Sequence, residues 1–178
     1  MSAADREGDA VDRLLAQWRR ERPDLDVAPM GVVGRISRAA RLVELEQRAT
    51  FAAHGLDRAS FDALATLRRA GTPHQLTPGQ LMATAMVSSG AITQRLDRLE
   101  ERGLVRREPA PHDARVVLVT LTPAGRAAVD AVLPDHLATE ERLLAGLTPE
   151  ERGRLADLLR RFLLVADPAS GPGDGSGA

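Results

Sequence analysis

With 178 residues, 43% of them hydrophobic and 28% charged, the chain is long enough to bury a core as one domain or two small lobes of a soluble globular protein. The absence of cysteine excludes disulfides, thiolate metal sites and a cysteine nucleophile, and it fits a location in the reducing cytoplasm. The net charge of −1 is not that of a typical nucleic-acid-binding domain, although all 24 basic residues are arginine, so every basic contact offers a planar guanidinium.

The N-terminal part of the chain predicts three helices. Apolar residues recur at helical spacing over about residues 8–21, 29–55 and 57–71. The first helix carries Trp18 on its apolar face, and Gly55 is a suitable C-cap for the second. No segment approaches the roughly 20 apolar residues of a membrane span. The N-terminus has no apolar stretch of signal length, so we expect neither a secretion signal nor an anchor.

The triplet Leu-Thr-Pro occurs three times, and each copy marks an expected helix start. Threonine can accept from the open N–H groups of a first helical turn, and the proline after it has a helix-ready φ angle. The threonines are Thr77, Thr122 and Thr148. They predict a short helix, a helix that reaches about Leu144, and a helix that reaches about Val165. Pro134 predicts a kink or a break in the second of these.

Between the first two triplets the pattern changes from helical to extended. A helix is expected to begin at Ser88 or Ser89 and to end at Gly103. Residues 104–109 and 114–121 are short, the second is rich in β-branched residues, and the turn-forming "APHD" joins them. They predict a two-stranded β-hairpin. Two helices joined by a short turn and followed by a hairpin suggest a winged helix-turn-helix, whose second helix enters the major groove.

The helix that begins near Ser88 has an outer face suited to DNA. Its apolar residues Ile92, Leu96 and Leu99 lie on one stripe and should pack inward. Small and polar residues then face outward, and the N–H groups at the start of the helix can meet phosphate. The candidate DNA-contacting residues here are Ser88, Ser89, Gly90, Thr93, Gln94 and Arg98. The alternative for Arg98 is a surface charge paired with Glu101.

The tip of the hairpin carries a second set of candidate DNA contacts, His112, Asp113 and Arg115. A guanidinium at a wing tip can enter the minor groove, where the potential is most negative when the groove is narrow. Asp113 can hold the guanidinium of Arg115 in the required orientation. The alternative is an aspartate that stabilises the turn beside a solvated arginine.

Two motifs and the order of the helices around them resemble a known family. The motifs are "RLDRLEERGLVRREP" and the Asp-x-Arg of "HDARVVLVTLTPAG". Together they are similar to the MarR family of bacterial transcription regulators, over about residues 28–166. The resemblance implies a homodimer with interleaved terminal helices, whose two winged lobes bind a near-palindromic operator with half-sites about one helical turn apart. The apolar faces of residues 29–54 and 150–165 suit that dimer, with an ordinary intrachain core as the alternative.

The same resemblance implies a division of the chain. Residues 1–27 would form an extra N-terminal helix, residues 28–56 and 122–166 a helical dimerisation region, and residues 57–121 the winged helix-turn-helix lobe that binds DNA. The Gly-, Pro- and Ser-rich residues 167–178 are expected to be a disordered tail. The expected fold class is mainly α with a small β-hairpin, as a dimeric winged helix-turn-helix.

The extra N-terminal helix resembles that of the urate-responsive branch of the family. This resemblance implies a ligand site made of Trp18, Asp62, Arg95 and Arg107. Two guanidiniums attract an anion, an aromatic ring stacks on it, and a carboxylate orients an arginine or accepts from a ligand N–H. A small anion, urate or an organic acid such as citrate, would attenuate DNA binding. The alternative is a structural ion-pair network with Trp18 as a core anchor.

Catalysis, metal binding and a cofactor are not expected. The four histidines are scattered, no two have the i, i+4 spacing of a helical metal site, and no cysteine joins them. Ser60, Ser88 and Ser89 lack a recognisable base or a nucleophile-elbow setting. The sequence thus predicts a DNA-binding transcriptional regulator, acting as a repressor. The alternative is a winged-helix protein-interaction module without specific DNA binding, which the near-neutral charge would suit.

Overall fold

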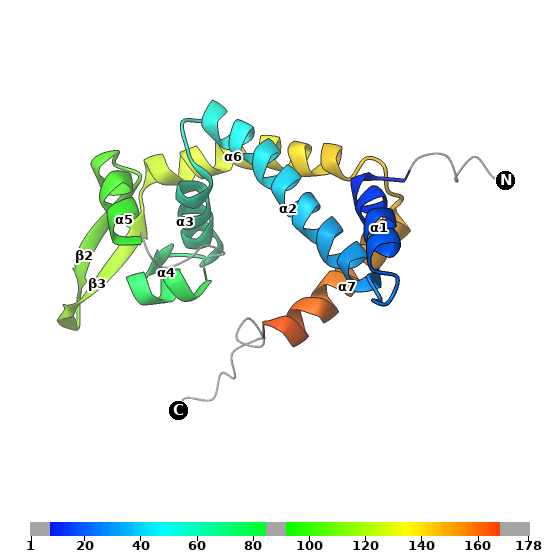
Figure 1. Cartoon of the computed structure of the whole chain (residues 1–178). Helices are drawn as coiled ribbons and strands as arrows, with labels where there is room; N and C mark the ends of the chain where they lie inside the picture. The colour runs from blue at the N-terminus through cyan, green and yellow to red at the C-terminus, as the bar shows by residue number, and fades with distance from the viewer. Residues whose placement is uncertain (1–7, 85–91, 168–178) are drawn as a thin grey trace. The chain divides into compact units, whose positions relative to one another are not determined.

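The computed structural model describes residues 8–84 and 92–167 (Figure 1). The chain divides into two compact units, residues 1–136 and 137–178. The elements of the first unit are α1 (Ala10–Glu21), α2 (Ala28–Ala53), α3 (Arg58–Arg69), β1 (Gln75–Leu76), α4 (Pro78–Thr84), α5 (Ile92–Glu101), β2 (Val105–Ala110), β3 (Asp113–Leu121) and the first part of α6 (Pro123–Leu143). The second unit holds the end of α6 and α7 (Pro149–Ala166). The expected tail from residue 168 onward lies outside the described residues.

All three Leu-Thr-Pro triplets begin a helix, as predicted. The hydroxyl of Thr77 accepts from the backbone N–H of Gln80 at 3.1 Å, and that of Thr122 accepts from the N–H of Gly125 at 2.9 Å. Thr148 forms a capping box with Glu151, in which each side chain accepts from the other residue's backbone N–H. These local hydrogen bonds satisfy N–H groups that the helix itself leaves open.

The helix α6 runs without interruption through Pro134, so the predicted alternative of a break at this residue is wrong. A proline removes one hydrogen bond from the i→i−4 ladder and crowds one carbonyl, but the bonds on either side of it still hold a long helix together. The boundary between the two compact units falls shortly after this proline, between His136 and Leu137.

The predicted hairpin of β2 and β3 is present, and a third strand extends it to an antiparallel sheet in the order β1-β3-β2. The added strand pairs Gln75 with Thr120 and Leu76 with Val119, and the Gln75 side chain donates to the Thr120 hydroxyl at 2.8 Å. Two residues are too few to show the alternation that reveals a strand in a sequence. The prediction of a two-stranded sheet was therefore incomplete.

The core of the first unit lies beneath the helix-turn-helix. Leu64 and Leu67 of α3 and Leu81 of α4 are fully buried, and Leu96 and Leu99 of α5 are 1% exposed. The inward stripe predicted for α5 is confirmed for these two leucines, while the side chain of Ile92 lies outside the described part of the structure. Full burial of such leucines stabilises the fold by about 1.5–3 kcal/mol each, and it fixes which face of α5 is presented outward.

Candidate DNA-binding surface and ligand site

The outer face of α5 presents polar side chains to solvent. Thr93, Gln94 and Arg98 are exposed on the side opposite the buried leucines. Arg98 forms no ion pair with Glu101 in the part of the chain that the structure describes, so its guanidinium is available to a phosphate or a base edge. Three further candidates, Ser88, Ser89 and Gly90, lie outside the described residues.

Asp57, the N-cap of α3, interacts electrostatically with two arginines of α5. Its carboxylate caps α3 by accepting from the backbone N–H of Ser60 at 2.6 Å. Burial opposes ionisation of this carboxyl group, but the hydrogen bonds from Ser60 and the positive charges of Arg95 and Arg98 lower its pKa below the ordinary value. The two arginines of α5 therefore lie within electrostatic reach of the exposed carboxylate that caps α3.

The wing tip holds one arginine in a defined orientation. The Nε and Nη2 atoms of Arg115 donate to the two carboxylate oxygens of Asp113 at 3.0 and 3.2 Å, and the backbone N–H of Arg115 donates to the same group at 3.0 Å. Hydrogen bonds from Arg115 lower the pKa of Asp113, so this carboxylate is ionised at neutral pH. The Arg115 side chain is 91% exposed, and His112 beside it in the turn is exposed as well. The predicted pairing of Asp113 with Arg115 is present.

Arg107 of β2 joins the wing to α5. Its Nη2 atom lies 2.7 Å from a carboxylate oxygen of Asp97 and 2.6 Å from one of Glu100, and its Nε donates to Glu100 at 2.8 Å. The backbone N–H of Arg107 donates to the other oxygen of Glu100 at 2.7 Å. The hydrogen bonds from Arg107 lower the pKa of Glu100. We call Arg107, Asp97 and Glu100 the wing clamp.

The four predicted ligand residues have different surroundings. Trp18 is 42% exposed on α1 and lines an apolar hollow whose other described residues are Leu14, Pro29, Met30, Val33 and Gly34. Asp62 is half-buried on α3 and Arg107 belongs to the wing clamp. Arg95 points partly inward, with a buried Nη1 atom that has no hydrogen-bond partner in the structure. The hollow beside Trp18 contains none of the other three residues.

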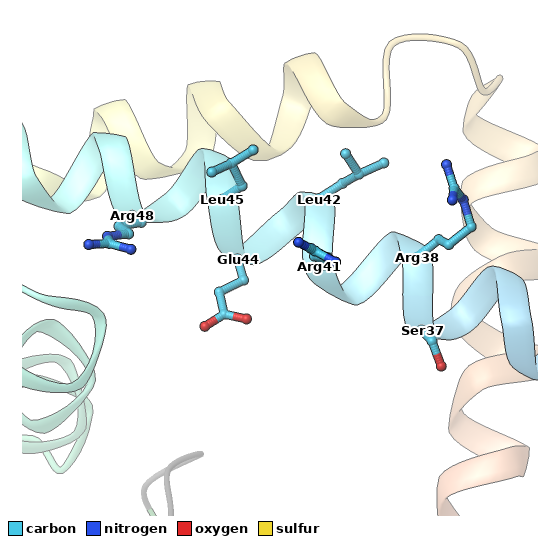
Figure 2. A pocket seen from close by; sticks show the side chains of 7 residues that line it. All are labelled: Ser37, Arg38, Arg41, Leu42, Glu44, Leu45 and Arg48. Atoms are coloured by element: carbon cyan, nitrogen blue, oxygen red, sulfur yellow. The ribbon is translucent and has the colours of Figure 1, made fainter.

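Sequence reasoning missed the carboxylates of the wing clamp and a cavity on α2. Asp97 and Glu100 are three residues apart on one helix, but "VRRE" offers two arginines to pair with them. The strand alternation turns Arg107 toward α5 and leaves Arg106 exposed. The cavity has a volume of about 700 Å³ and is lined by residues of α2 between Ser37 and Arg48 (Figure 2).

The described residues contain neither a cluster of metal ligands nor a helix suited to a membrane. No group of three or more His, Asp or Glu side chains is placed to bind a metal ion there. Among the same residues, no helix is both long and apolar enough to cross a membrane.

Comparison with known proteins agrees with the winged helix-turn-helix built from these elements. The sequence profile of the MarR family matches residues 54–116, which include α3, α4, α5 and the tip of the wing. The transcriptional regulator PecS of Dickeya dadantii is 40% identical over 151 residues, which are 85% of this chain and 91% of PecS.

Two solved structures share the fold and more than a quarter of the aligned residues. A mutant of MarR from E. coli, in complex with operator DNA, is 30% identical with a TM-score of 0.67, covering 77% of this chain and 95% of that one. BpsR of Bordetella bronchiseptica, whose DNA binding is regulated by 6-hydroxynicotinic acid, is 29% identical with a TM-score of 0.67, covering 74% of this chain and 91% of that one. With a recognition helix and a wing in the family's order, the chain belongs to the MarR family of transcriptional regulators.

Proposed function

We propose that the protein is a repressor that binds a near-palindromic operator as a homodimer and releases it when a small anion binds. The single observation that carries the DNA-binding part is the wing tip. There Arg115 is almost fully exposed and is held by a bidentate pair with Asp113. A preoriented guanidinium loses little freedom on entering a minor groove, which suits a DNA contact better than a solvated surface charge.

The proposed contacts divide between the two grooves. In the major groove, Thr93, Gln94 and Arg98 of α5 would contact base edges and phosphates. Ser88, Ser89 and Gly90 are proposed to contact DNA at the start of the same helix. In the minor groove, Arg115 would be the principal contact, with His112 and Asp113 beside it.

The proposed homodimer rests on apolar surface that the single chain leaves uncovered. No residue of α7 is buried, although the helix carries Leu155, Leu158, Leu159, Phe162 and Leu163. On α2, Leu42 and Leu45, three residues apart on one side of the helix, are 56% and 62% exposed. Contiguous apolar faces of this kind mark interaction surfaces, and a second copy is the partner that the two half-sites of a palindrome require.

The proposed release by an anion draws on the wing clamp and on Arg95. Arg95 has a buried guanidinium nitrogen without a partner, on the helix that would read DNA. Arg107 is already neutralised by Asp97 and Glu100, so an anion that binds it must displace one of them. Such displacement would loosen the wing from α5. The ligand would therefore favour a conformation that binds DNA poorly, as a population shift requires. We propose urate or an organic acid such as citrate, as in the urate-responsive branch.

The test of DNA binding is fluorescence anisotropy with the DNA upstream of the protein's own coding region. The measurement is repeated at several salt concentrations, with a scrambled duplex as control. Specific binding with a steep salt slope is expected, because phosphate contacts release counterions. If no fragment of the source genome binds at low salt, the DNA-binding proposal is wrong and a protein-interaction module becomes the better explanation.

The test of the ligand site adds urate and citrate separately to the protein–operator complex. Either compound is expected to lower the anisotropy at constant ionic strength. Substitution Arg107→Ala should weaken binding of the active compound to the DNA-free protein. If neither compound releases DNA and the substitution changes binding of neither, the site made of Trp18, Asp62, Arg95 and Arg107 is rejected.

A further inference from the structure

Pro134 stands inside a helix, where a proline is unfavourable. Among the helices that the structure describes, the other prolines lie in the first turn, where no N–H is needed, and only α6 carries one in its interior. Pro134 cannot donate to the backbone carbonyl of Asp130, so this part of α6 lacks one of the bonds that stiffen a helix. We call residues 130–134 the proline turn. Local features that cost stability often mark functional positions.

The proline turn lies where α6 leaves the packed core of the first unit. Val129 and Val132 are fully buried in that core. The carboxylate of Asp130 also pairs with the Nε atom of Arg68 on α3 at 2.9 Å. Beyond the proline turn, Leu137 is 59% exposed, and the boundary between the two compact units directly precedes it. The helix therefore loses a stiffening bond at the point where the packing of the first unit ends.

A side-chain contact crosses the proline turn and joins its far side to the first unit. The Nε2 atom of His54, at the C-cap of α2, lies 2.8 Å from a carboxylate oxygen of Asp135. The Asp135 side chain is 65% exposed, and exposed pairs of this kind are weak restraints. The contact thus favours one bend of α6 without locking it.

We propose that α6 bends at the proline turn and that this bend lets the dimer accept operators with different half-site spacings. One base pair turns a half-site by about 35° around the DNA axis, since a helical turn holds about 10–10.5 base pairs. Two protomers that share this rotation contribute about 17° each, and prolines are the usual cause of helix kinks above about 20°. The bending is a property of one chain, whereas its role in spacing rests on the proposed homodimer.

Distances between two spin labels in one chain test the bending. The chain has no cysteine, so Ala70→Cys at the end of α3 and Ala145→Cys after α6 give two defined labels, both at exposed positions. Dilution with unlabelled protein restricts the signal to pairs within one chain. A bend of about 20° displaces a point about 15 Å beyond Pro134 by about 5 Å. Pulsed electron paramagnetic resonance should therefore give a broad distribution of distances.

Pro134→Ala restores the backbone N–H and should narrow this distribution to about half its width. Asp135→Ala removes the contact with His54 and should broaden it. The matched control is Pro123→Ala in the first turn of the same helix, which should leave the distribution unchanged. The bending is refuted if the wild type and Pro134→Ala give equal widths, or if Pro123→Ala narrows the distribution as much as Pro134→Ala does.

Operator duplexes with one base pair inserted or removed between the half-sites test the role in DNA recognition. Relative to the native spacing, the wild type should lose less than about threefold in affinity and Pro134→Ala about tenfold or more, measured by fluorescence anisotropy. A purely structural role of Pro134 would change the affinity equally for all the duplexes. Equal losses in the two proteins overturn the role in spacing. A protein that binds none of the duplexes overturns the proposed function and this role with it, while the label distances still decide whether α6 bends.

Discussion

Arg115 is the residue whose exposure and pairing most directly predict a measurable role. Substitution Arg115→Ala should lower operator affinity about tenfold. The plot of the logarithm of the binding constant against the logarithm of the salt concentration should become shallower by about one, as expected for loss of one phosphate or groove contact. The melting temperature should hardly change, because an exposed ion pair contributes about 0–1 kcal/mol. Anisotropy across salt concentrations measures both effects. An unchanged affinity would show that the wing tip does not contact DNA.

Gly125, which ends the motif "HDARVVLVTLTPAG", is required by a close approach of two backbones. A Cβ at this position would collide with the carbonyl oxygen of Leu104 and come within 2.9 Å of a methyl group of Leu121. Gly125→Ala should therefore lower the free energy of unfolding by about 1–3 kcal/mol, as overpacking typically does. The control is Gly153→Ala on α7, where an added Cβ meets no atom within 4 Å and should stabilise the helix by up to ~1 kcal/mol. Equal melting temperatures for the two variants would contradict this account.

At the scale of elements, the wing clamp decides how the wing sits on α5. The Arg107 side chain pairs with both carboxylates and its backbone N–H donates to Glu100, so this residue ties β2 to α5 through side chain and backbone. Glu100→Gln removes the charge but keeps an acceptor for the backbone N–H. Operator affinity should fall severalfold because the wing is held less firmly, whereas Glu101→Gln, an exposed residue without an ion pair in the described part of the chain, should leave it unchanged.

The same clamp predicts a pH dependence of stability with a defined sign. Arg107 lowers the pKa of Glu100 below its ordinary value of 4.5. A depressed pKa in the folded state means that the stabilisation is present above the unfolded-state pKa and is lost as the pH falls through the folded-state pKa. The melting temperature of the wild type should exceed that of Glu100→Gln at neutral pH, and the difference should shrink below about pH 4.5. A difference that is constant from pH 7 to pH 3 would exclude the ion pair as its cause.

At the scale of the whole molecule, the exposed apolar residues of α7 predict the oligomeric state. Phe162 is 47% exposed, and a charge there would be buried in the proposed dimer. Phe162→Glu should convert a dimer of two 19.1 kDa chains into monomers in sedimentation velocity, and operator binding should weaken because half-sites would be bound singly. Arg161→Glu, the neighbouring exposed position, should leave the dimer intact. A wild-type protein that sediments as a monomer at micromolar concentration would refute the dimer.

Features that depend on neighbours in the sequence were predictable. These features are the three threonine-proline helix starts, the hairpin, and the pairing of Asp113 with Arg115. Each arises within a few residues, because a capping hydrogen bond joins residues three apart and Asp113 and Arg115 are only two apart. The inward stripe of α5 followed from helical periodicity alone. The family followed from motifs of the same local kind.

Only the tertiary structure decided the features that join distant segments. The strand Gln75–Leu76 exists because β3, more than forty residues later, offers it hydrogen bonds. Arg107 rather than Arg106 forms the clamp because the sheet turns one face of β2 toward α5. The 42% exposure of Trp18 and the pairing of Arg35 on α2 with Asp9 and Asp12 likewise depend on which groups the fold brings near them, which no local pattern of residues encodes.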